Sequence, residues 1–159
     1  MRVLFVCLGN ICRSPTAEGV FRQQLQAAGL SDGVDVDSCG IAAWHVGKAP
    51  DPRTREAALR RGVDLGSLRA RQLSADDFFR FDYLLAMDQA NLAALHEQRP
   101  VGCPAHVGLF LDFGDHAERE VPDPYYGGEQ GFDEVLDLVD AASRGLVEEI
   151  RQRLEAQTS

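Results

Sequence analysis

The chain has 159 residues, of which 45% are hydrophobic and 26% charged, and 16 Lys and Arg against 25 Asp and Glu give a net charge of −9 at pH 7. This length and composition predict one globular domain spanning residues 1–159. The acidic balance argues against a nucleic-acid-binding protein, which needs a basic surface, and the apolar runs are too short for a signal peptide or a membrane span.

A buried strand, a tight loop and a helix start open the chain. The apolar run 3–6 predicts a strand that is covered on both faces, as in a parallel sheet. Gly9 and Asn10 then predict a turn, and Pro15 favours the first turn of a helix. Cys7 is therefore expected at the carboxyl end of the strand, directly before the loop.

The loop between strand and helix suits an anion. Helix N-termini carry unpaired N–H groups and partial positive charge, and the same field favours a thiolate, which is the nucleophilic form of cysteine. Arg13 follows Cys7 after five residues, and a guanidinium binds phosphate oxygens bidentately. The pattern indicates an oxyanion site with a cysteine nucleophile, and the alternative is a buried thiol with a solvated arginine.

Further elements follow in chain order. Apolar residues at helical spacing after Pro15 predict a helix that ends at Gly29, and alternation over 34–38 predicts a half-exposed second strand. Ser38 ends that strand, at the sheet edge where ligands bind in open α/β sheets. The long loop that follows carries Trp44, the only tryptophan, which in a loop serves either as an anchor for the fold or as a wall of a binding cleft.

The rest of the chain continues the alternation of helices and strands, which predicts a parallel sheet covered on both faces. Asp88 is expected to cap a helix, since aspartate is a preferred N-cap residue. The predicted elements are a helix at 52–61, a strand at 81–87, a helix at 89–98, a strand at 106–111 and a closing amphipathic helix from 132 to 154.

A second informative stretch is Asp123, between Pro122 and Pro124 and before Tyr125 and Tyr126. The two prolines fix a non-helical turn that can hold a carboxyl group away from its own backbone. Alone, the stretch is typical of a polar surface turn. Combined with a cysteine nucleophile, it supplies a proton donor for the leaving group.

The segment Cys7 to Pro15, with Thr16-Ala17-Glu18 after it, resembles the phosphate-binding loop of the low-molecular-weight protein tyrosine phosphatases, and 123–126 matches their Asp-Pro-Tyr-Tyr segment. The likeness extends over almost the whole chain. It implies a three-layer α/β/α sandwich with a four-stranded parallel sheet and the phosphate loop after the first strand. It also implies a cysteinyl-phosphate intermediate on Cys7, with Asp123 as general acid.

The resemblance assigns the remaining site residues. Those expected to bind phosphate are Leu8, Gly9, Asn10, Ile11, Cys12, Arg13 and Ser14. Those expected to form the substrate cleft are Trp44, Tyr125 and Tyr126. A serine at the position of Ser38 supports the phosphate loop in the family. One departure is Leu68, where the family commonly has a histidine that braces the loop asparagine, so that either another group braces Asn10 or the loop is looser.

The expected substrate is a phosphotyrosine protein or another aryl phosphate, and the product is phosphate. A phosphoarginine phosphatase is a rival, but such bacterial relatives tend to have threonine at the position of Ile11. An arsenate reductase is another, although Cys39 and Cys103 are far apart in sequence and it needs two cysteines close together. No metal and no cofactor are expected, since the His and Cys residues lack ligand spacing. A cytoplasmic protein is expected because a thiolate needs a reducing compartment, and a monomer with at most weak self-association.

Overall fold

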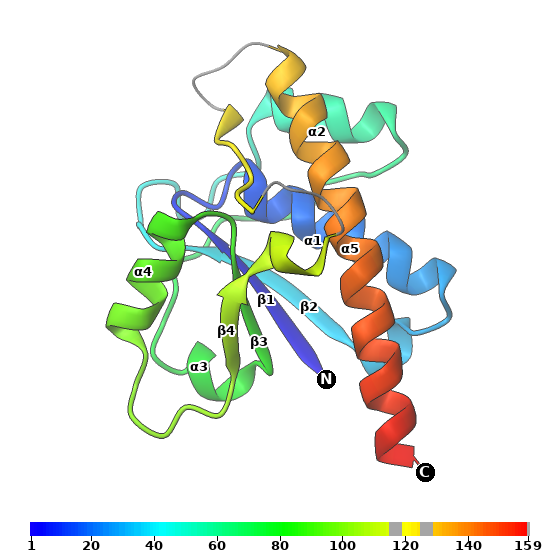
Figure 1. Cartoon of the computed structure of the whole chain (residues 1–159). Coiled ribbons are helices and arrows are strands. Elements are labelled where there is room, and N and C mark those ends of the chain that lie inside the picture. The colour runs from blue at the N-terminus through cyan, green and yellow to red at the C-terminus, as the bar shows by residue number, and fades with distance from the viewer. Residues whose placement is uncertain (115–118, 125–128, 159) are drawn as a thin grey trace.

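The computed structural model describes residues 1–114, 119–124 and 129–158. Its centre is a four-stranded sheet in which every neighbouring pair is parallel, with the order β2-β1-β3-β4 (Figure 1). The strands are β1 (Arg2–Cys7), β2 (Asp35–Gly40), β3 (Tyr83–Ala86) and β4 (His106–Leu109).

Helices cover both faces of this sheet. Side chains of α1, α2 and α5 form the core on one face, and side chains from α3 and α4 form the core on the other. The helices are α1 (Arg13–Ala27), α2 (Pro52–Arg60), α3 (Asp77–Arg80), α4 (Gln89–Gln98) and α5 (Glu129–Thr158), with the 3-10 turns η1 (Ser31–Gly33) and η2 (Phe110–Phe113). This arrangement confirms the predicted α/β/α sandwich with a parallel sheet.

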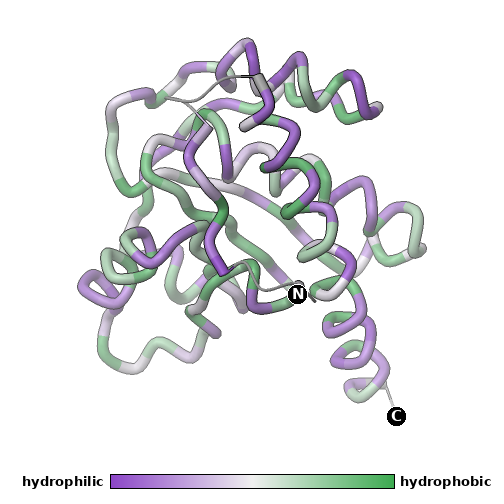
Figure 2. The backbone as a smooth tube through the Cα atoms, turned by 45° about the horizontal axis from the view of Figure 1, so that its top comes forward, coloured by the Kyte–Doolittle hydropathy of each residue, from purple (hydrophilic) through white to green (hydrophobic). Residues whose placement is uncertain are grey.

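The alternation of side chains along β1 divides the core into two layers. Val3 and Phe5 pack with α1 and α5, whereas Leu4 and Val6 pack on the opposite face, and all four are fully buried. Figure 2 shows hydrophobic backbone through the middle of the fold and alternating hydrophilic and hydrophobic stretches along the helices. β1 is therefore the buried, two-sided strand that its apolar run predicts.

Local signals explain where the helices begin and end. Asp51 and Asp88 cap α2 and α4, since each side chain accepts a hydrogen bond from a backbone N–H of the first turn. After α1, Gly29 has a φ of 75°, the left-handed conformation that glycine adopts without steric cost. The predictions of the Gly29 stop and the Asp88 cap are confirmed.

Strand ends are where the structure differs from the sequence prediction. β2 continues to Gly40, because it pairs with β1 as far as Cys7. The fourth strand stops at Leu109, and the chain then turns into η2 instead of extending to Leu111. In the part of the chain that the structure describes, no helix is long and apolar enough to cross a membrane.

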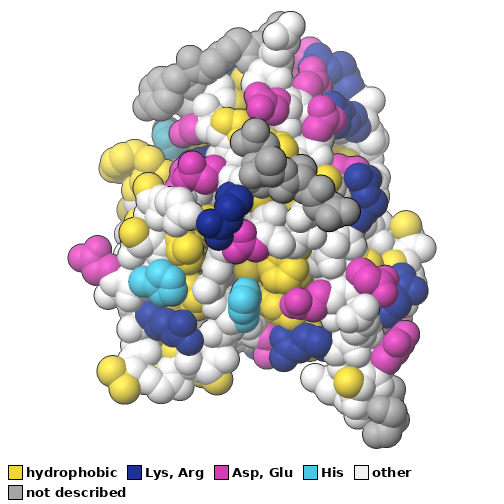
Figure 3. Space-filling view, viewed as in Figure 1, with side chains coloured by type: hydrophobic (Ala, Val, Ile, Leu, Met, Phe, Trp, Pro, Cys, Tyr) yellow, Lys and Arg dark blue, Asp and Glu magenta, His cyan; other side chains and the backbone are white. Residues whose placement is uncertain are grey.

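The topology places a crevice at the carboxyl edge of the sheet. β1 leads into α1 on one face, whereas β3 leads into α4 on the other. β1 and β3 are neighbours, so the loops that follow them diverge at this point, which is where open α/β sheets bind ligands. Figure 3 shows acidic and basic side chains interspersed over the face seen there, with no basic patch collected on it.

Candidate active site

The loop from the end of β1 to the start of α1 forms the floor of the site. Asn10 has a φ of 57°, a left-handed conformation that a non-glycine residue rarely adopts, and Cys12 occupies the N-cap position of α1. Gly40 allows the end of β2 to approach this loop, because a Cβ there would lie 2.9 Å from the carbonyl oxygen of Leu8. The loop is thus held tightly against the sheet.

Two polar groups contact the Cys7 sulfur. The Ser14 hydroxyl lies 3.0 Å from Cys7 Sγ, and the backbone N–H of Asn10 donates to it over 3.2 Å. Cys7 and Ser14 are almost completely buried. A hydroxyl and a backbone N–H can both donate, so both groups can act as hydrogen-bond donors to this sulfur.

The Asn10 side chain ties the loop to the second strand. Its Nδ2 donates to Ser14 Oγ over 2.8 Å and to Ser38 Oγ over 3.0 Å. Its Oδ1 accepts a hydrogen bond of 3.0 Å from the backbone N–H of Arg71. Another group therefore braces Asn10 in this chain, which has Leu68 where a histidine was expected.

Arg13 is held by carboxylates beside the loop. Its Nη1 donates to Asp88 Oδ2 over 2.6 Å and to the carbonyl oxygen of Val121 over 3.0 Å, and its Nη2 lies 3.9 Å from Asp123 Oδ2. Burial alone lowers the pKa of Arg13, but the charges of Cys7, Asp88 and Asp123 outweigh it and the pKa is raised. The guanidinium therefore stays charged and is oriented by fixed acceptors.

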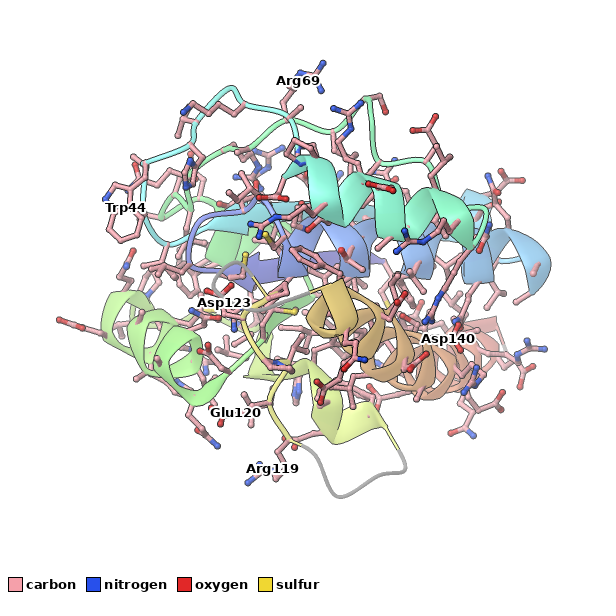
Figure 4. The ribbon with its side chains drawn as sticks, turned by 90° about the horizontal axis from the view of Figure 1, so that it is seen from above. Trp44, Arg69, Arg119, Glu120, Asp123 and Asp140 are labelled. Atoms are coloured by element: carbon pink, nitrogen blue, oxygen red, sulfur yellow. The ribbon has the colours of Figure 1, made fainter. Side chains whose placement is uncertain are left out.

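These side chains border one pocket with a volume of about 340 Å³. Its lining residues are Cys7, Leu8, Gly9, Ile11, Cys12, Arg13, Trp44, His45 and Asp123. Figure 4 shows Trp44 on the loop after β2 and Asp123 on the segment before α5, so that the rim comes from distant parts of the sequence. Trp44 is 70% exposed, so its ring lies at the open rim of the pocket.

The structure brings Cys7, Arg13, Asp123 and Trp44 together around one pocket. Tyr125 and Tyr126 lie outside the described residues. Sequence reasoning missed His45, although its place next to Trp44 was a signal. Asp88, which the sequence predicts as a helix cap, both caps α4 and binds Arg13.

A family model described as low molecular weight phosphotyrosine protein phosphatase matches residues 2–156. The chain belongs to this family. It is a protein-tyrosine phosphatase, and hence a hydrolase.

Relatives with known names and structures agree with this membership. The low molecular weight phosphotyrosine protein phosphatase of Schizosaccharomyces pombe is 50% identical over 143 residues, which cover 88% of this chain and 91% of that protein. A protein tyrosine phosphatase of Entamoeba histolytica, solved with Hepes in its active site, superposes with a TM-score of 0.92 at 38% identity, over 96% of this chain and 97% of the other. A drosophila arginine phosphatase superposes with a TM-score of 0.88 at 30% identity, over 94% and 98% of the two chains.

All four cysteines of this phosphatase are free and buried, but their surroundings differ. Burial raises the pKa of Cys12 to about 12, and it raises the pKa of Cys39 well above the usual value. The Cys103 thiol donates to the carbonyl oxygen of Phe78 over 3.1 Å. Cys12 shares the pocket with Cys7, whereas Cys39 and Cys103 pack in the core on the α4 face.

Among the described residues, no three His, Cys, Asp or Glu side chains are grouped so as to hold a metal ion. The positive charge in the pocket of this phosphatase comes from Arg13, and the N-terminus of α1 adds its dipole. Both favour an anion that carries two charges, such as a phosphate monoester.

Proposed function

We propose that this phosphatase hydrolyses aryl phosphate monoesters, phosphotyrosine in proteins above all, through a cysteinyl-phosphate on Cys7. The observation that carries the proposal is a single pocket lined by a cysteine whose sulfur contacts a hydroxyl and a backbone N–H, a fixed guanidinium and a carboxyl group. These are the nucleophile, the phosphate clamp and the proton donor that a two-step phosphoryl transfer requires.

In the first step, the Cys7 thiolate attacks phosphorus, an S–P bond forms and the ester P–O bond breaks. Arg13 and the N–H groups of residues 8–14 hold the non-bridging oxygens, which share the negative charge of the transition state. The Asp123 carboxyl group gives its proton to the departing phenolate oxygen. The product of this step is a neutral phenol and a phosphorylated Cys7.

In the second step, water attacks the cysteinyl-phosphate, the S–P bond breaks and phosphate leaves. Asp123 takes the proton from the attacking water, so that it ends the cycle protonated, as it began. The Cys7 sulfur leaves as a thiolate, which the hydroxyl of Ser14 at 3.0 Å stabilises as a hydrogen-bond donor. Arg13 and the helix dipole supply the positive field, so we expect turnover without added metal.

The rim of the pocket favours an aromatic leaving group. Leu8, in the phosphate loop, and Trp44, on the loop after β2, are exposed apolar side chains that line the pocket. A flat ring between them would bury apolar surface that is in water in the free enzyme. Tyr125 and Tyr126, which lie outside the described residues, are proposed to complete this cleft.

The direct test uses p-nitrophenyl phosphate and a phosphotyrosine peptide, without added metal. We expect both to be hydrolysed and rapid acid quench to trap phosphate on Cys7. Cys7→Ser should abolish turnover while the variant still binds vanadate. Turnover by Cys7→Ser above a trace level would overturn the proposed nucleophile.

A phosphoarginine phosphatase is the second candidate, because the drosophila arginine phosphatase shares the fold at 30% identity. Ile11 lines the pocket and argues for the aryl ester, since an apolar side chain offers no hydrogen bond to a guanidine nitrogen. A phosphoarginine peptide of the same sequence separates the two candidates. We expect a higher kcat/KM for the phosphotyrosine peptide, and the reverse order would favour phosphoarginine.

An arsenate reductase is disfavoured. A relay of thiols needs accessible sulfurs that reach the reacting cysteine, but Cys39 and Cys103 are buried in the core on the α4 face. The high pKa of Cys39, caused by burial, also keeps its thiol protonated. We expect no reduction of arsenate in the presence of thioredoxin, measured with the same enzyme that hydrolyses p-nitrophenyl phosphate.

We infer that the protein works as a monomer in a reducing compartment, the cytoplasm. A nucleophilic thiolate beside a second thiol, Cys12, is kept active only where thiols stay reduced. The net charge of −9 supports protein substrates over nucleic acid. Light scattering across a concentration series measures the oligomeric state directly.

A further inference from the structure

Glu18 is a buried carboxylate that the proposed mechanism does not use. It lies on α1, one turn after Ser14, and is only 2% exposed. Its Oε1 accepts a hydrogen bond of 2.7 Å from Ser38 Oγ, and its Oε2 forms an ion pair of 2.6 Å with Arg22 Nη2. Both oxygens of the carboxylate thus face a donor.

The carboxylate fixes the direction of a hydrogen-bond chain. An ionised carboxylate can only accept, so the single hydroxyl proton of Ser38 must point at Glu18. The Ser38 oxygen then accepts from Asn10 Nδ2 at 3.0 Å. The backbone N–H of Arg71 donates to Asn10 Oδ1, which favours the same orientation of the Asn10 side-chain amide.

The chain ends at the reacting sulfur. The second Nδ2 proton of Asn10 goes to Ser14 Oγ at 2.8 Å, so Ser14 accepts there and must direct its own proton elsewhere. Two acceptors are within reach, Cys7 Sγ at 3.0 Å and the carbonyl oxygen of Cys39 at 3.4 Å. The shorter contact is the one to the sulfur.

We propose that Glu18 is a positioning residue that, through Ser38 and Asn10, holds the Ser14 hydroxyl as a donor to the Cys7 sulfur. The proposal rests on the proposed role of Cys7 as the group that is phosphorylated and then leaves as a thiolate. The effect of Glu18 on the rate is greatest in the second step, where the Ser14 proton stabilises the departing Cys7 sulfur.

The energetics of Glu18 agree with a functional role. Burial raises its pKa, although the hydrogen bond from Ser38 and the charges of Arg22 and Arg71 lower it, and Asp37 raises it further. A carboxyl group whose pKa is raised by folding stabilises the fold below its unfolded pKa and loses that contribution as pH rises through the folded pKa. The ionised form of Glu18 is therefore the less stabilising form, as is common for groups retained for a site.

Glu18→Gln is the decisive variant, because its amide has one acceptor oxygen and one donor nitrogen where the carboxylate has two acceptor oxygens. Arg22 can only donate, so it keeps the remaining oxygen, and the amide N–H turns toward Ser38. The Ser38 hydroxyl then loses its acceptor and no longer directs the chain. We expect kcat for a phosphotyrosine peptide to fall about tenfold, the equivalent of one weakened charge-assisted hydrogen bond.

The ratio of the kinetic constants identifies the step. If dephosphorylation slows, the cysteinyl-phosphate accumulates, so kcat and KM should fall together while kcat/KM changes little, and a burst of phenol should appear. A merely structural role would lower the amount of folded enzyme, which reduces kcat and leaves KM unchanged. Thermal unfolding of each variant measures that contribution separately.

Two further variants complete the test. Glu149→Gln is the matched control, because Glu149 also accepts from a buried hydroxyl, that of Tyr83 at 2.6 Å, but lies outside the site. We expect it to leave kcat and KM unchanged. In a Ser14→Ala background, Glu18→Gln should add little further loss, since the donor that it positions is already absent.

The proposal would be overturned if Glu18→Gln lowered kcat by the same factor in the wild-type and Ser14→Ala backgrounds. It would also be overturned if kcat fell at constant KM and in proportion to the fall in Tm. The wild-type enzyme distinguishes this failure from a failure of the proposed function. If rapid quench traps no phosphate on wild-type Cys7, the mechanism itself is wrong, whatever Glu18→Gln does.

Discussion

Asp123 is the proposed proton donor, and the effect of replacing it should depend on the leaving group. Tyrosine's phenol, with a pKa of about 10, leaves poorly unless it is protonated, whereas nitrophenolate leaves without help. Asp123→Asn should therefore slow phosphorylation by a phosphotyrosine peptide by roughly 10²–10⁴, and by p-nitrophenyl phosphate much less. Single-turnover kinetics isolates this step.

The comparison of substrates is the control for Asp123. Its carboxylate also lies 3.9 Å from Arg13 Nη2, so a purely structural effect of Asp123→Asn would weaken phosphate binding for both esters alike. Equal losses at the phosphorylation step would mean that Asp123 only shapes the pocket. Asp88 would then be the next carboxylate to test, since it lies beside the same guanidinium.

Cys12 is expected to take part in reversible oxidation. Burial raises its pKa to about 12, so at neutral pH its sulfur is protonated and Cys7 is the sulfur that peroxide oxidises first. The resulting sulfenic acid condenses with the Cys12 thiol to give a disulfide and water. Dithiothreitol should restore activity in the wild type but not in Cys12→Ser, as followed by activity and peptide mapping. If the two recover equally, Cys12 is only a small apolar residue that fills the loop.

At the scale of the elements, Asp88 joins the N-terminus of α4 to the phosphate clamp. Asp88→Asn separates its two roles, because asparagine caps helices as well as aspartate does but carries no charge. We expect little change in stability and a loss of roughly 10- to 100-fold in kcat/KM, the value of a charge-assisted hydrogen bond to Arg13. Asp88→Ala, which removes the cap as well, should also lower the Tm. A normal kcat/KM in Asp88→Asn would show that Val121 and Asp123 suffice to hold Arg13.

The features that could be predicted from the sequence are those that depend on neighbouring residues, and the features that could not depend on contacts between distant elements. Local patterns determined β1, the loop and the start of α1, because apolar runs, turn residues and helix caps are encoded by neighbours in sequence. The bracing of Asn10 by the backbone of Arg71 could not be predicted, since any residue type provides that N–H and only the fold brings it near. The same holds for His45, whose place in the pocket depends on how the loop after β2 packs against Gly9. That residues 1–159 form one domain, and which roles the site residues have, stay predictions.

At the level of the whole molecule, Tyr83 on β3 connects the sheet to α5 through hydrogen bonds. Its hydroxyl donates to Glu149 over 2.6 Å and accepts from Arg153 Nη1 over 2.6 Å, and both partners lie on α5. Burial and the hydrogen bond to Glu149 raise the pKa of Tyr83. A raised pKa means that its stabilising contribution is complete below about pH 10 and is lost as pH rises through the folded value.

Tyr83→Phe should therefore lower the free energy of unfolding by about 1 kcal/mol at pH 8, the net value of a hydrogen bond. Urea titrations at pH 8 and in the alkaline range measure the difference between wild type and variant. That difference should shrink at alkaline pH, because the wild type loses the same contribution there. A difference that stays constant would show that the pKa of the Tyr83 hydroxyl does not change on unfolding. As a control, the variant should have the same kcat as the wild type.

The hydrogen bond from Arg13 to the carbonyl oxygen of Val121 spans 108 positions of sequence, and the bond from Arg71 to Asn10 spans 61. Such a site has a high contact order, so it cannot form on a partly assembled chain. During synthesis or refolding, we therefore expect the pocket around Cys7 to form only after β3, the segment before α5 and the loop before residue 72 have all docked. The proposed nucleophile thus acquires its partners only in the complete fold, and the rate of alkylation of Cys7 during refolding would report the last step of assembly.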